Sequence, residues 1–92
     1  MKKILVVVSI LLATIAVKAE YLNWQVGTSV TFNGTTYKSG TDYNYVRMYA
    51  SNDNNSSHTY GIFEAPGTYS TQVQSGYDST GTSYYIELLN YS

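Results

Sequence analysis

The sequence predicts an all-β fold, a small antiparallel β-sandwich of six to seven short strands after an N-terminal signal peptide helix. Ser, Thr, Asn, Gly and Tyr dominate the chain beyond residue 19, and these residue types favour strands and turns over helices. Polar and apolar residues alternate with a period of two in several segments, which is the pattern of half-buried strands. Turn residues separate these segments about every 8 to 12 positions, a spacing typical of sandwiches.

The first 19 residues have the three-part pattern of a secretory signal peptide. Two lysines at positions 2 and 3 precede an apolar stretch over residues 4–17, and small residues stand at positions 17 and 19. A membrane anchor is the alternative, but the apolar run has about 14 residues where a spanning helix needs roughly 20. We therefore predict secretion through a Sec signal with cleavage between Ala19 and Glu20, and Ala16 is the alternative site.

Cleavage would leave a single β-sandwich domain, residues 20–92, with a net charge of −4. Lys38 and Arg47 are then the only cations against six carboxylates, so no basic stripe exists that could neutralise the phosphates of a nucleic acid. The chain has no cysteine, which excludes a disulfide framework, a thiolate zinc site and a cysteine nucleophile. Large aromatic side chains, eleven tyrosines among them, must therefore build much of the core.

The first strands of the domain are expected at residues 21–24, 28–32 and 35–38. Asn33-Gly34 separates the last two, and it is the strongest short signal for a hairpin, because a type I′ turn needs positive φ at both central positions. A longer strand is expected at residues 43–50. Its alternation gives one face with Tyr43, Tyr45, Arg47 and Tyr49, suited to a surface, and another with Asn44, Val46, Met48 and Ala50, suited to a core.

Three further strands are expected at residues 58–64, 69–75 and 82–89. A polar loop at residues 51–57 precedes them, and a break at residues 65–67 and a turn at residues 76–81 separate them. In the last strand one face carries Tyr84, Ile86 and Leu88, and the other carries Ser83, Tyr85 and Glu87.

The polar residues that could carry out chemistry lack the partners that catalysis requires. His58 is the only histidine and has no nucleophile beside it in the sequence. Glu64 and Glu87 could form the carboxylate pair of a glycosidase, but nothing fixes their separation, and solvated strand charges are the alternative. Residues 53–55 offer oxygen ligands for calcium without the spacing of an EF-hand loop, and a hydrogen-bonded turn explains them better. We therefore expect no enzyme, no metal site and no cofactor.

The tyrosines are the strongest functional signal. Their number exceeds what a small core can absorb, and alternation directs Tyr43, Tyr45 and Tyr49 outward. Rigid amphipathic side chains of this kind are common in carbohydrate-binding and protein-binding surfaces, whereas cross-strand pairs that only stiffen the sheet are the alternative. Arg47 shares the face of these tyrosines, where it could bind a phosphate or a carboxylate, or could stack on its neighbours.

Short motifs at both ends of the predicted domain resemble those of a secreted family. They are Trp24-Gln25-x-Gly27, then Gly67 followed by Tyr69, Thr71 and Val73 in alternation, then Tyr84-Tyr85 and a terminal Tyr91. This arrangement is similar to that of the lactococcin 972 family of bacteriocins. The resemblance implies a cysteine-free β-sandwich, released by a Gram-positive bacterium, that acts on the envelope of dividing cells by binding the cell-wall precursor lipid II.

Two functional hypotheses follow. The first is a secreted, bacteriocin-like antibacterial protein that binds a component of the bacterial cell envelope, with lipid II as the candidate, through Tyr43, Tyr45, Arg47 and Tyr49. The alternative is a secreted structural or adhesive β module that self-associates or binds surface glycans. Low charge and strand edges guarded only by Lys38 and Arg47 favour that alternative.

Overall fold

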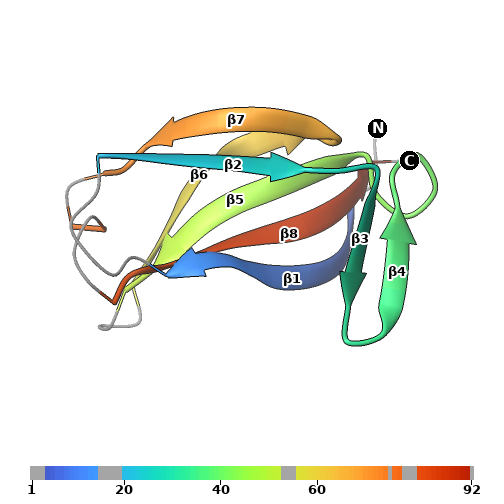
Figure 1. Ribbon diagram of the computed structural model, residues 1–92, viewed down its shortest axis with the longest axis horizontal. Helices are drawn as coiled ribbons and strands as arrows, with labels where there is room; N and C mark the ends of the chain where they lie inside the picture. The colour runs from blue at the N-terminus through green and yellow to red at the C-terminus, as the bar shows by residue number, and fades with distance from the viewer. Residues whose placement is uncertain (1–3, 15–19, 53–55, 75, 78–80, 92) are drawn as a thin grey trace.

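The computed structural model describes residues 4–14, 20–52, 56–74, 76–77 and 81–91, and all regular structure in these ranges is β-strand (Figure 1). The strands are β1 (Ile4–Thr14), β2 (Tyr21–Val26), β3 (Ser29–Phe32), β4 (Thr35–Lys38), β5 (Tyr45–Ser51), β6 (Ser57–Glu64), β7 (Gly67–Gln72) and β8 (Ser83–Tyr91). Every pairing between these strands is antiparallel, which confirms the predicted all-β class. The described ranges contain no helix that could span a membrane.

The strands form two layers with a hairpin at one end (Figure 1). β1, β8, β5 and β6 hydrogen-bond in that order into a four-stranded sheet, β2 and β7 form a two-stranded ribbon over it, and β3 pairs with β4. One apolar core joins the layers and includes Trp24 and Val26 from the ribbon with Val46, Met48 and Leu88 from the sheet. We call the sheet face that meets this core the inner face, and the opposite one the outer face.

β5 and β8 alternate between these two faces as the sequence predicts. On β5, Val46, Met48 and Ala50 are completely buried, while the residues between them are half-buried. On β8, Tyr84 and Leu88 are likewise buried on the inner face. Burial of each large side chain contributes roughly 1.5–3 kcal/mol, so the inner face supplies a major part of the folding free energy.

Trp24 is the centre of the contact between the ribbon and the sheet. Its ring centroid lies 5.2 Å from that of Phe63 and 4.8 Å from that of Tyr69, and its Nε1 donates a hydrogen bond of 2.8 Å to Thr71 Oγ1. The Tyr69 ring lies so close to Gly67 that a Cβ atom there would stand 2.5 Å from the tyrosine hydroxyl. The glycine at the start of β7 is therefore required by close packing of this ring.

The hairpin predicted at Asn33-Gly34 is confirmed. Asn33 has a φ of 51° and Gly34 a φ of 82°, the positive values that a type I′ turn needs. The register pairs Phe32 with Thr35 across the turn. A short polar turn thus sets the register of β3 with β4, and the opposed residues Val30 and Tyr37 of this hairpin pack against the core.

The predicted signal peptide helix is not what the structure shows, because residues 4–14 form strand β1. β1 pairs along the whole of β8, from Ile4 opposite Tyr91 to Thr14 opposite Ser83. Two properties explain the difference: this segment is rich in β-branched residues, and it is apolar enough to pack on the core through Val8, Ile10 and Leu12. The predicted cleavage after Ala19 stays a prediction, and residues 15–19 lie outside the described ranges.

Candidate binding face

The outer face of the four-stranded sheet carries the residues that the sequence singled out. Register places the outward side chains of neighbouring strands side by side: Arg47 lies between Glu87 of β8 and Ile62 of β6, and Tyr49 lies between Tyr85 and Thr59. β1 adds Ser9 and Leu11 at the edge, opposite Glu87 and Tyr85. We call the set Tyr45, Arg47, Tyr49, Tyr85, Glu87 and Tyr91 the aromatic face.

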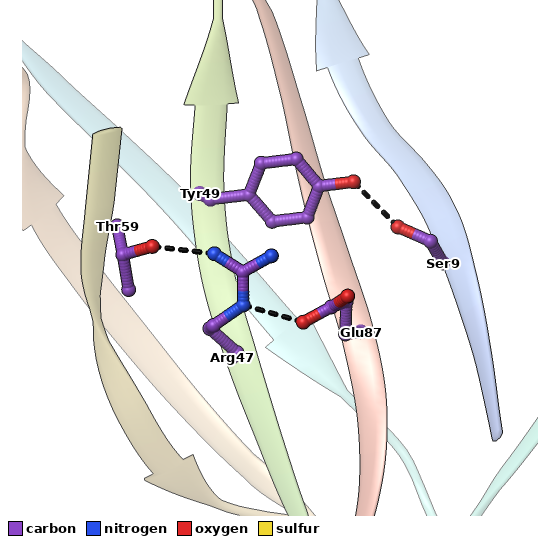
Figure 2. A network of polar contacts seen from close by, with 5 residues as sticks. All are labelled: Ser9, Arg47, Tyr49, Thr59 and Glu87. Carbon is purple, nitrogen blue, oxygen red and sulfur yellow. Dashed lines mark hydrogen bonds and ion pairs between the residues drawn. The ribbon is translucent and has the colours of Figure 1, made fainter. Parts of the chain in front are cut away.

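Arg47 is the polar centre of the aromatic face (Figure 2). Its Nε donates a hydrogen bond to the Glu87 carboxylate and one terminal nitrogen donates to the Thr59 hydroxyl. The guanidinium carbon lies 4.3 Å from the centroid of the Tyr49 ring, within the range of a cation–π contact. Of the two roles left open for Arg47, stacking on a neighbour is therefore confirmed, and Glu87 already balances its charge.

The tyrosines of this face are held in fixed pairs. Tyr49 and Tyr85 stack with centroids 5.2 Å apart, and Tyr45 meets Tyr91 edge to face at 4.9 Å. Figure 2 shows the Tyr49 hydroxyl pointing toward Ser9 of β1, to which it hydrogen-bonds at 2.5 Å. All four rings are half-buried, so the pairing that stiffens the sheet leaves part of each ring accessible to a ligand.

The predicted placement of Tyr43 on this face is wrong. Its side chain is completely buried and its hydroxyl donates a hydrogen bond of 2.7 Å to the carbonyl of Gly27. β5 begins only at Tyr45, because residues 38–42 form a turn in which the Asp42 carboxylate accepts the Lys38 amide at 2.7 Å. Alternation therefore does not extend back to position 43. Burial, and secondly the Asp42 carboxylate, raise the pKa of the Tyr43 phenol above its ordinary value of 10.0.

The acidic and histidine candidates do not converge. Glu87 is paired with Arg47, whereas Glu64 lies opposite Tyr45 on β6, and β5 runs between the two glutamates. His58 lies elsewhere, with its ring 4.7 Å from Tyr60 and 5.6 Å from Tyr77 between centroids. Within the described residues no three His, Asp or Glu side chains gather as metal ligands, and residues 53–55 lie outside them.

The ribbon carries a separate concavity on its own surface. Asn23, Trp24, Gln25 and Thr68 line a shallow depression of about 310 Å³. This depression lies on the other layer of the sandwich, so the aromatic face is a sheet surface with no contribution from it. A ligand of the aromatic face would therefore lie across strands rather than enter this hollow.

Comparison of the chain with protein-family models, with curated proteins and with solved structures gives no significant match. The resemblance to the lactococcin 972 family therefore stays a prediction that depends on its short motifs.

Sequence reasoning missed the part that β8 plays in this face. Alternation put Tyr85 and Glu87 on one face of their own strand, but the pattern within one strand does not reveal which strand lies next to it. The pairing of β5 with β8 brings Tyr85 to Tyr49 and Glu87 to Arg47. The opposite charges of Arg47 and Glu87, each in the middle of a predicted strand, were the one signal that could have indicated this pairing.

Proposed function

We propose that this chain is a secreted, non-catalytic protein that binds a sugar-containing component of the bacterial cell envelope through its aromatic face. The observation that carries the proposal is the stacked pair of Tyr49 and Tyr85 with Arg47 held against it. Half-buried rings in fixed positions offer flat apolar surface and hydroxyl groups together, and they lose little conformational entropy when a ligand binds.

The charge of the aromatic face favours the sugar over a phosphate as the group that is bound. Arg47 is the cation of this face and its Nε is engaged by Glu87, while residues 20–92 carry a net charge of −4. Such a surface attracts a pyrophosphate only weakly. Neutral sugar rings instead can pack their C–H faces on tyrosine rings and hydrogen-bond to the hydroxyls. Lipid II contains both chemistries, so its sugars are the part we expect to be recognised.

The proposal is tested by the binding of the purified full chain to isolated cell-wall sacculi and to soluble cell-wall glycan fragments. We expect Tyr49→Ala to weaken binding at least about tenfold, because a central aromatic contact contributes more than about 1.4 kcal/mol. Tyr49→Phe keeps the ring and should keep most of the affinity. Gln25→Ala changes a side chain of the ribbon depression and is the matched control. Equal binding by Tyr49→Ala and the unsubstituted chain would exclude the aromatic face.

A growth-inhibition assay separates the two hypotheses drawn from the sequence. The chain is tested on Gram-positive strains, with lipid II added as a competitor and septum morphology scored. Inhibition that lipid II relieves would support the bacteriocin-like function, and inhibition that it does not relieve would keep an envelope target and discard lipid II. Glycan binding without any inhibition would favour the adhesive module.

A further inference from the structure

β8 is an interior strand of the sheet only because β1 lies beside it. The sheet order is β1-β8-β5-β6, and β1 pairs with β8 from one end to the other, with register shifts between Val6 and Val8 and between Leu11 and Ala13. β1 is also the apolar segment of the predicted signal peptide, which contains no charged residue between positions 4 and 14. Removal of residues 1–19 would therefore turn β8 into an edge strand.

An uncovered β8 would lack the usual protection of a sheet edge. Its backbone N–H and C=O groups on the β1 side would have no partner, and Ile86 and Leu88 would lose the cover of Val8, Ile10 and Leu12. Natural edge strands are protected by proline, lysine, bulges or inward-pointing charges. The nine residues Ser83–Tyr91 contain no proline, glycine or lysine, and their single charge, Glu87, is paired with Arg47.

We infer that cleavage of the leader opens the edge of β8 and that β8 of a second copy of this chain then pairs with it in antiparallel register. The inference rests on the secretion in the proposed function, since it needs the leader to be removed, but it does not depend on glycan binding. The product would be a two-fold dimer with one continuous sheet of six strands, in the order β6-β5-β8-β8-β5-β6.

A second copy fits this edge because β8 repeats the pattern of β1. β1 directs Ile10 and Leu12 toward the core, and β8 directs Ile86 and Leu88 toward it in the same alternation. A two-fold axis makes identical strands antiparallel, which is the arrangement that β1 has on β8. Full overlap of Ser83–Tyr91 with its own copy would place Glu87 directly opposite Glu87. A slip of two residues, which places Ile86 opposite Ile86, separates the two carboxylates and keeps inward side chains opposite inward side chains, whereas a slip of one residue would reverse the faces. The two aromatic faces would then adjoin on one side of the dimer.

The test uses the full chain with a protease recognition sequence inserted between Ala19 and Glu20, so that the leader is cut after folding. The cut peptide is released in dilute denaturant and removed by dialysis. We expect the uncut chain to have the molar mass of a monomer in light scattering, because two bulges, between Val6 and Val8 and between Leu11 and Ala13, protect the sheet edge that β1 forms. After release of the leader the mass should double. Hydrogen exchange should show the amides of β8 still protected, with the β3–β4 hairpin as the internal reference.

Added peptide provides the control for the site of pairing. An excess of the peptide of residues 1–14 should return the dimer to a monomer mass, because it reoccupies β8. The same peptide with V8D, I10D and L12D should have no effect. The inference is overturned if the cut chain stays monomeric, if its β8 amides lose protection, or if the unsubstituted peptide fails to reverse the doubling. A binding assay on sacculi is independent of all three results, so failure of the dimer and failure of the proposed function are distinguishable.

Discussion

The inner and outer faces of the four-stranded sheet are built from the same strands and differ in what their side chains do. On β8 the inward Tyr84 is completely buried and its hydroxyl donates a hydrogen bond of 2.6 Å to the Tyr77 carbonyl. The next residue, Tyr85, is half-buried and stacks on Tyr49 of β5. Of these adjacent tyrosines, Tyr84 thus packs in the core and Tyr85 contributes to an accessible aromatic surface on the opposite face. In a small domain without cysteine, the same residue type supplies both core volume and candidate binding groups.

The largest expected difference between the faces is in their contribution to stability. Leu88→Ala removes a completely buried side chain from the inner face and should lower the free energy of unfolding by about 2–5 kcal/mol. Tyr85→Ala removes an outer ring from a cross-strand pair and should lower it by about 1 kcal/mol. Urea denaturation of the full chain measures both. Equal losses would show that the outer face is as important for folding as the core.

A second comparison is between the buried Tyr43 and Tyr45 of the outer face. Tyr43→Phe leaves the Gly27 carbonyl without its donor and should lower stability at neutral pH by about 1 kcal/mol, whereas Tyr45→Phe should change it less. The raised pKa of Tyr43 means that the folded state favours the neutral phenol, so its stabilisation is complete below pH 10.0 and is lost as the pH rises through the folded pKa. The difference in the free energy of unfolding between the unsubstituted chain and Tyr43→Phe should therefore become smaller above pH 10.0. A constant difference measured up to alkaline unfolding would contradict the buried placement.

The smallest effect is expected from the ion pair of the aromatic face. Arg47 and Glu87 are 29% and 21% exposed, so water and salt weaken their attraction. Glu87→Gln should lower the free energy of unfolding by about 1 kcal/mol or less, and the loss should shrink further at high salt. Thermal unfolding at low and high ionic strength measures this. A loss well above about 2 kcal/mol would mean that the pair acts as a buried one. The outer face would then contribute to stability to an extent closer to that of the inner face.

Local signals in the sequence were sufficient for most of the fold. Asn33-Gly34 determined its hairpin because the turn depends on two residues alone, and alternation on β5 assigned Val46 and Met48 to the core correctly. Alternation failed at Tyr43 because this residue directly follows the turn of residues 38–42 and precedes the start of β5 at Tyr45, so the periodicity of the strand does not apply to it.

Two parts of the structure depend on contacts between segments that are distant in the sequence, and they could therefore not be predicted from the sequence. The apolar run of residues 4–14 fits a signal peptide and a buried strand equally well, and only the presence of β8 beside it gives it a strand partner. The Arg47–Glu87 pair joins positions 40 residues apart, so it required knowledge of the strand order. The candidate face was predicted in part, whereas its network of contacts was not.

The burial of Trp24 gives this chain an optical reporter of its own. The indole is 5% exposed, lies between the ribbon and the sheet, and is the only tryptophan in the sequence. Its fluorescence should therefore report whether the two layers are docked, since separation would admit water to the ring. A ligand on the aromatic face would bind on the far side of the sheet and perturb tyrosine absorbance instead. Layer separation and ligand occupancy can thus be followed in one sample at two wavelengths.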